Sequence, residues 1–203
     1  MGFRIDNATL KEAMLRNFRI IVVCLICLAL ALPSRTQTAG SSDSSEYLIK
    51  AGFIYNFSNL MQWPASAFSK SDSPIVIGIL GTDTFGGMLD EVLGGKKVNG
   101  RSFLVKHLKW GMELKDCNIV FVSPSETAHL EEIFHLLKGL PILTIGETPS
   151  FARRGGVINF IVVDDKVRFE VNVEAAKQAD INISSRLLAL AKIVPPGDGS
   201  KVP

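Results

Sequence analysis

Two histidines and two glutamates in one short segment are the side chains of this chain best suited to holding a metal ion. His129, Glu131, Glu132 and His135 fall in a stretch whose apolar spacing predicts a helix. A zinc-binding helix of the H-E-x-x-H type places its histidines one turn apart, whereas His129 and His135 are six residues apart. This spacing indicates a charged outer face of the helix, and we predict no metal site.

Nucleophilic and phosphate-binding chemistry also find little support in the sequence. Ser123 and Ser125 precede His129, but no acid can be placed beside that histidine, so the spacing does not define a triad. The segment GTDTFGG, which begins at Gly81, lacks the Gly-Lys-Ser/Thr ending of a phosphate loop and does not fit G-x-G-x-x-G. We therefore expect no catalytic residue, no cofactor and no enzyme activity; a hydrolase with an unfamiliar site is the alternative.

The first 39 residues have the features of an export signal. Arg16 and Arg19 precede thirteen apolar residues, 20–32, and small and polar residues follow up to Ala39. The apolar run is shorter than the roughly 20 residues that span a bilayer. We predict that residues 1–39 are removed on export; an uncleaved membrane anchor is the alternative.

Removal of this segment changes the charge balance and the cysteine count. The segment holds five of the 22 basic side chains and two of the 20 acidic ones, so the remainder carries a net charge of −1. A chain with this balance offers no bulk attraction for nucleic acid, and we predict none as a partner. Of the three cysteines, Cys117 alone lies beyond residue 39, so no internal disulfide can form. We predict a buried, inert thiol, with an intermolecular bridge as the alternative.

Apolar strand patterns alternate with helical patterns along the rest of the chain. They predict one α/β domain, residues 46–194, after a flexible lead, 40–45, and before a disordered tail, 195–203. The expected fold is a mostly parallel sheet flanked by helices on both faces, with a C-terminal antiparallel hairpin and a terminal helix. The expected elements are helices over 45–62, 82–93, 125–137, 173–179 and from Ser184, and strands over 74–80, 103–108, 118–122, 141–145, 157–163 and 166–171.

The fold class itself predicts where a ligand would bind. In open parallel sheets, ligands occupy the crevice beyond the carboxyl ends of the strands. The residues that follow three of the expected strands form a candidate ligand rim: Gly81, Thr82, Ser123, Glu147 and Thr148. This rim is a location and carries no chemical motif.

The segment around the expected hairpin supplies most of the remaining candidate residues. Gly155 and Gly156 allow a tight turn before the first strand, with positive φ at one or both. We assign structural roles to core phenylalanines, to asparagines beside the strands and to helix caps: Asn159, Phe160, Phe169, Asn172, Ser184 and Ser185.

Aromatic and arginine side chains are the usual centres of protein interfaces. Trp63, Phe151, Arg153 and Arg154 are therefore the candidates for contact with a partner. A solvated arginine pair is the alternative interpretation of Arg153 and Arg154.

Five segments of this chain together resemble the YfiR family of exported regulatory proteins. They cover nearly all of the chain beyond residue 39: AGFIYNFSNLMQWP (51–64), CNIVFVS (117–123), PILTIGE (141–147), FARRGGVINFIVVDDKVRFEVN (151–172) and ISSRLLALAKIV (183–194). The resemblance implies a periplasmic regulator that binds the periplasmic part of an inner-membrane diguanylate cyclase and represses it. Repression would lower cyclic di-GMP and biofilm formation.

The resemblance also implies a homodimer. The family's best-known member carries internal disulfides, which this chain cannot form with Cys117 alone. A periplasmic small-ligand-binding protein without a cyclase partner is the alternative function.

Overall fold

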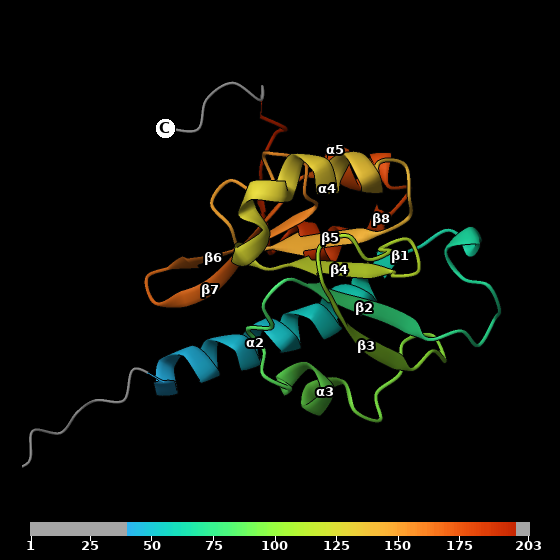
Figure 1. Ribbon diagram of the computed structural model, residues 1–203, viewed down its shortest axis with the longest axis horizontal. Helices are drawn as coiled ribbons and strands as arrows, with labels where there is room; N and C mark the ends of the chain where they lie inside the picture. The colour runs from blue at the N-terminus through green and yellow to red at the C-terminus, as the bar shows by residue number, and fades with distance from the viewer. Residues whose placement is uncertain (1–39, 198–203) are drawn as a thin grey trace, which may run out of the picture. The chain divides into compact units, whose positions relative to one another are not determined.

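Seven strands in the order β3-β2-β4-β5-β6-β7-β9 form the central sheet (Figure 1). The computed structural model describes residues 40–197, so the predicted signal segment, 1–39, and most of the predicted tail, 198–203, lie outside the described residues. The five strands from β3 to β6 run parallel, β7 is antiparallel to β6, and β9 is parallel to β7. The strands are β2 (Ile75–Leu80), β3 (Phe103–Leu108), β4 (Ile119–Val122), β5 (Leu143–Gly146), β6 (Ile158–Val163), β7 (Lys166–Val171) and β9 (Lys192–Ile193). This topology confirms the predicted α/β fold.

Helices cover both faces of the sheet, as predicted (Figure 1). Helices α2 and α3 contribute to the core on one face, and α4 contributes to the core on the other. The helices are α2 (Gly40–Leu60), α3 (Met88–Leu93), α4 (Leu130–Leu137), α5 (Val173–Gln178) and α6 (Ser185–Leu188), with short 3₁₀ turns η1 (Ala65–Ala67) and η2 (Pro124–His129). Among these described helices, none is long and apolar enough to cross a membrane.

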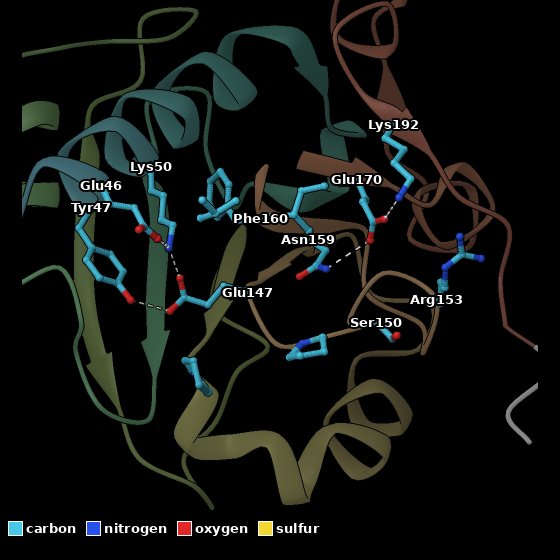
Figure 2. A pocket seen from close by; sticks show the side chains of 14 residues that line it. Glu46, Tyr47, Lys50, Glu147, Ser150, Arg153, Asn159, Phe160, Glu170 and Lys192 are labelled. Carbon is cyan, nitrogen blue, oxygen red and sulfur yellow. Dashed lines mark hydrogen bonds and ion pairs between the residues drawn. The ribbon is translucent and has the colours of Figure 1, made fainter. Parts of the chain in front are cut away.

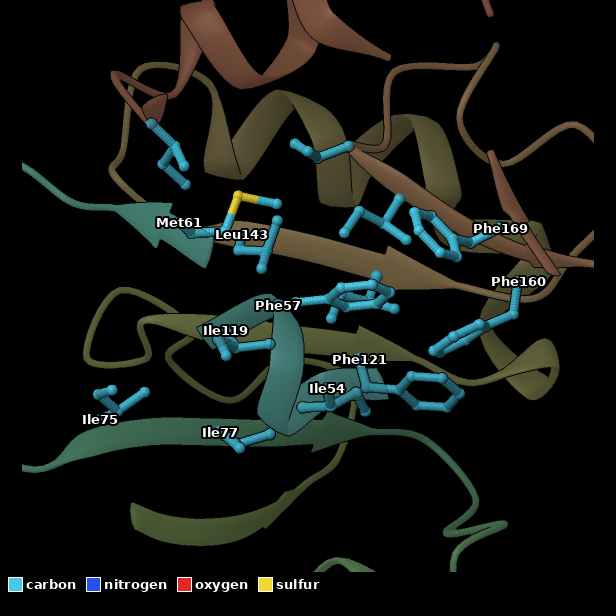
Figure 3. Packing of buried hydrophobic residues seen from close by; sticks show 14 of the residues in the cluster. Ile54, Phe57, Met61, Ile75, Ile77, Ile119, Phe121, Leu143, Phe160 and Phe169 are labelled. Carbon is cyan, nitrogen blue, oxygen red and sulfur yellow. The ribbon is translucent and has the colours of Figure 1, made fainter. Parts of the chain in front are cut away.

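The larger core forms where α2 packs on the sheet (Figure 3). Ile54, Phe57 and Met61 lie three and four residues apart on one face of the segment and are at most 2% exposed. The Phe57 ring lies 5.8 Å from the ring of Phe160 and 5.0 Å from that of Phe169, both of which the sequence assigns to the core. Each such side chain contributes roughly 1.5–3 kcal/mol when buried, so this aromatic group fixes α2 against the hairpin.

Helix α2 begins earlier and ends earlier than its sequence pattern predicts. It starts at Gly40, so residues 40–45, expected to be a flexible lead, form its first turns. It ends at Leu60 because the next two residues form β1 (Met61–Gln62), which pairs antiparallel with β8 (Asn182–Ile183). A long-range strand pairing therefore overrides the local helical pattern at this end.

The other helices are shorter than predicted. The helix expected from Thr82 is confined to α3, because Gly81, Gly86 and Gly87 adopt φ values of +93°, +56° and +90°. The helix expected from Ser125 divides into η2 and α4. The expected terminal helix is the single turn α6, since the chain then pairs with β7 as β9.

The hairpin of β6 and β7 extends past the end of its neighbour in the sheet. Asp164 and Asp165 form a two-residue turn with φ values of 50° and 55°, which matches the right-handed twist of the strands. The last pair between β5 and β6 is Gly146 with Asn159. Beyond that pair, β6 continues from Phe160 without β5 beside it, and this overhang forms one side of a groove.

Candidate functional site

The overhanging hairpin, the start of α2 and the segment after β5 enclose a groove of about 610 Å³ (Figure 2). It lies beyond the carboxyl ends of β4 and β5, where parallel sheets place their ligands. We call it the strand-end groove. Its lining residues are Glu46, Tyr47, Lys50, Pro124, Glu147, Pro149, Ser150, Arg153, Asn159, Phe160, Ile161, Val162, Glu170 and Lys192.

At one end of this groove, a buried lysine pairs with two glutamates. Lys50 is 3% exposed, and its ammonium pairs with Glu46 at 2.5 Å and with Glu147. The Tyr47 hydroxyl donates to the other Glu147 oxygen at 2.9 Å, and the Tyr47 ring centroid lies 4.3 Å from the ammonium. Glu147 therefore receives two donors from consecutive turns of α2, which joins the helix to the end of β5.

The surroundings shift two pKa values in this network upward. Burial alone would lower the pKa of Lys50, but hydrogen bonds to Glu147 and Glu46 outweigh it and raise that pKa above 10.5. Burial raises the pKa of the Tyr47 phenol above 10.0, and the Glu147 carboxylate adds to the rise. The network therefore contains a charged lysine and a neutral tyrosine around neutral pH.

We expect the stability of the protein to fall as the pH rises above about 10. A raised Lys50 pKa contributes stability that is present below 10.5, the ordinary value, and is lost as the pH rises through the folded-state pKa. The raised Tyr47 pKa acts in the same direction, because the folded protein holds the phenolic proton more tightly. Urea unfolding between pH 8 and pH 11 measures this, and a Tyr47→Phe variant should lose less stability over the window. Unchanged stability up to pH 11 would contradict it.

A second ion pair lies at the other end of the groove. Glu170 is 7% exposed, and its carboxylate pairs with Lys192 at 2.9 Å. The Asn159 amide nitrogen is 3.4 Å from the second Glu170 oxygen; turned by 180°, it donates to the Thr148 and Gly146 carbonyl oxygens instead. Either orientation ties β6 to its surroundings, the structural role that the sequence assigns to Asn159.

Arg153 and Ser150 line the same end of the groove (Figure 2). Neither side chain has a hydrogen bond or ion pair to any residue in the described part of the chain, and Arg153 is half-buried. Ser150 has a φ of 63°, in the left-handed region that a residue with a Cβ adopts at a cost. The neighbouring Arg154 is also half-buried but does not line the groove.

We expect Ser150→Gly to stabilise the protein by about 0.5–1 kcal/mol. Glycine removes the strain of the positive φ, which outweighs its larger entropy in the unfolded chain. The Ser150 side chain contributes no hydrogen bond that would be lost. Urea denaturation checks this against Ser150→Ala, which keeps a Cβ and should give no gain. Equal effects of the two substitutions would show that φ is not the cause.

The five residues of the predicted ligand rim do not lie at one site. Glu147 lines the groove, whereas Gly81, Thr82 and Ser123 lie together at the ends of β2 and β4, outside it. There the Ser123 hydroxyl donates to the Thr82 carbonyl oxygen. Thr148 is 5% exposed, with its hydroxyl 3.3 Å from that of Thr127. Of the rim residues, only Glu147 is thus part of the strand-end groove.

The side chains around His129 form local contacts. His129 Nδ1 lies 3.1 Å from a Glu126 oxygen, and its ring stacks on Trp110 at 4.5 Å. The Ser125 hydroxyl donates to Glu126 rather than to His129, so the Ser125–His129 pair that the sequence offers is not in contact. The described residues contain no group of three His, Cys, Asp or Glu side chains that could hold a metal ion. Cys117 is buried, and burial raises the pKa of its thiol.

The structure corrects one of the four partner-contact predictions. Phe151 is fully buried, so its side chain cannot touch a partner in this fold. Its ring packs edge-on against Phe134, with centroids 5.2 Å apart. Trp63, Arg153 and Arg154 are half-buried, so contact between these side chains and a partner stays a prediction.

The remaining motif residues have local structural contacts. Gly155 has a φ of 126°, while Gly156 has no positive φ. Asn172 caps α5 by accepting from the Ala175 amide at 3.0 Å, and it donates to the Ala152 carbonyl at 2.7 Å. The Ser184 hydroxyl caps α6 by accepting from the Leu187 amide, and Ser185 is the first residue of that turn.

Sequence reasoning missed Lys50, the buried lysine at one end of the groove. The pair of Glu46 and Lys50 has the i,i+4 spacing that usually marks a solvated helix surface. The only signal was its position within an otherwise apolar helix face, which indicates a paired, buried charge.

Comparison with known families agrees with this geometry. The YfiR/HmsC-like family model matches residues 47–192, which is well over half of the chain. The matched region contains six of the seven strands of the sheet, the first residue of β9 and every groove residue except Glu46. The chain therefore belongs to the YfiR/HmsC-like family.

Proposed function

We propose that this protein is an exported, non-catalytic brake on an inner-membrane diguanylate cyclase. It would bind the periplasmic part of the cyclase and thereby lower cyclic di-GMP and biofilm formation. The family match over residues 47–192 carries the proposal, since membership supports a role as a periplasmic regulator in the cyclic di-GMP system. The identity of the partner as a cyclase is the proposed step.

The brake would act through differential affinity. A bound protein shifts an equilibrium between active and inactive states only by the ratio of its affinities for the two states. Turning a cyclase that is 99% active into one that is 99% inactive needs about 10⁴-fold tighter binding to the inactive state. The half-buried Trp63, Arg153 and Arg154 remain the candidate contacts for such binding.

Cyclic di-GMP levels in the native cell test this proposal. We expect the level to rise when the gene is deleted and to return when the full chain is restored. A chain without residues 1–39 should fail to restore it, because the brake must reach the periplasm. No rise on deletion, or equal rescue by both forms, would contradict the proposed function.

We also propose that residues 1–39 are removed on export and that the mature protein is a homodimer. N-terminal sequencing of protein recovered from the periplasm should begin close after Ala39. Light scattering on that protein should give twice the mass of one chain. A retained N-terminus or a single-chain mass would overturn the respective proposal.

A further inference from the structure

We infer that the strand-end groove binds a small organic monocarboxylate, whose anionic group pairs with Arg153 and whose apolar part lies against Pro149 and Ile161. This inference goes beyond the proposed brake on a cyclase, because it concerns a ligand of this chain alone. It does not depend on the identity of any protein partner.

Among the three cationic side chains that line the groove, Arg153 is the one without an ion-pair partner among the described residues. Lys50 is held by Glu46 and Glu147, and Lys192 is held by Glu170. Arg153 has no side-chain partner within residues 40–197. A guanidinium is always charged and offers paired donors that match an oxyanion. Because Arg153 is half-buried, water compensates it incompletely, and an anionic group in the groove would be favoured.

A second unused donor lies beside this arginine. The Ser150 hydroxyl makes no hydrogen bond among the described residues and lines the groove three positions before Arg153. Figure 2 shows both side chains at the same end of the groove. Strained backbone such as the positive φ of Ser150 is concentrated at ligand and functional sites. The two side chains together provide donors for one carboxylate.

The size and walls of the groove favour an organic ligand over an inorganic ion. Its volume of about 610 Å³ falls within the range of small-molecule sites. Apolar surface comes from Pro124, Pro149 and Ile161, which line the groove and are not buried in the core. A ring or short apolar chain would bury its surface there while its anionic group reaches Arg153.

The acidic residues of the groove limit the charge of the ligand. Glu46, Glu147 and Glu170 line the same space as Arg153. The second charge of a phosphate ester would face these carboxylates, whereas a monocarboxylate brings only the charge that Arg153 neutralises. A carboxylate is therefore favoured over a phosphate.

Three probes that share one ring test this inference. Benzoate, phenyl phosphate and benzyl alcohol are titrated into the purified protein while backbone amide NMR shifts are followed. We expect benzoate to bind, with shifts centred on Ser150, Arg153 and Ile161, and to bind more tightly than phenyl phosphate. Benzyl alcohol should bind at least about tenfold more weakly, because it lacks the charge that the guanidinium pairs with.

The neighbouring arginine provides a matched control. Arg153→Gln should weaken benzoate binding at least about tenfold, whereas Arg154→Gln, outside the groove, should leave it unchanged. The Arg153 backbone carbonyl, which accepts from Gly197, is kept in the variant. Amide shifts away from the groove verify that both variants fold.

Several outcomes would overturn the inference. One is the absence of benzoate binding at about 10 mM, a concentration above the dissociation constants expected for a well-placed fragment. Others are tighter binding of phenyl phosphate than of benzoate, equal binding of benzyl alcohol and benzoate, and equal losses of benzoate binding in the two arginine variants. Shifts that centre away from the groove would do the same. A protein that passes these tests but leaves cyclic di-GMP unchanged on deletion would keep the ligand site and lose the cyclase proposal.

Discussion

Replacing Gly156 with alanine is expected to destabilise the protein by about 3 kcal/mol. A Cβ at Gly156 would lie 2.1 Å from Phe151 Cε1, and one at Gly146 would lie 2.5 Å from Phe151 Cδ2. The ring is therefore held between the backbones of two glycines. Because Phe151 is fully buried, it cannot rotate toward solvent to make room. The cost comes from this contact alone, since Gly156 has no positive φ.

Urea unfolding of Gly156→Ala measures this cost, and a second glycine supplies the control. Gly52 lies within α2, where an added Cβ would have no atom within 4 Å. Gly52→Ala should therefore stabilise the protein by about 0.5–1 kcal/mol, through its helix propensity. A loss below about 0.5 kcal/mol in Gly156→Ala, within the scatter of neutral substitutions, would contradict the packing argument.

If the Phe151 ring causes the loss of stability in Gly156→Ala, a smaller side chain at position 151 should reduce that loss. In a Phe151→Leu background the smaller side chain leaves room, so Gly156→Ala should cost at least about 1 kcal/mol less than in the original protein. Additive effects of the two substitutions would show that the glycine acts through something other than the ring.

The strands were predictable because their pattern is local. Apolar runs bounded by turn residues predicted every strand of the seven-stranded sheet except β9, and β3 and β7 have the predicted bounds. Helix ends were less predictable, since they depend on pairing elsewhere. Met61 pairs with Ile183, and no local pattern around Met61 indicates a partner so distant in the chain.

The groove was predictable in place and much less so in composition. Ligands of parallel sheets bind beyond the carboxyl ends of the strands, and this rule needs only the order of strands and helices. It therefore predicted Glu147 from the sequence. Lys50 is 97 residues from Glu147, and nothing in one sequence links the two. Phe151 was misjudged for a related reason. An aromatic residue beside two arginines is typical of an interface, but Gly146 and Gly156 are the residues that make space for its ring.

Replacing Lys50 with methionine is expected to cost about 3–5 kcal/mol. Methionine fills the space of the lysine stem but leaves the Glu147 carboxylate, which is 8% exposed, without its cation. A buried carboxylate without a partner is far costlier than the intact pair. The Tyr47 hydroxyl would remain as its one donor in the network, which reduces the cost but does not supply a charge.

A double-mutant cycle separates this buried charge from simple loss of packing. Lys50→Met combined with Glu147→Gln should recover most of the lost stability, because glutamine is neutral and still accepts from Tyr47. Glu46→Gln is the matched control, since Glu46 is 32% exposed and should contribute less than about 1 kcal/mol. If Lys50→Met costs no more than Glu46→Gln, the ion pair with Glu147 is not what joins α2 to the end of β5. If the double variant is less stable than Lys50→Met alone, Glu147 stabilises the fold through a contact other than the lysine.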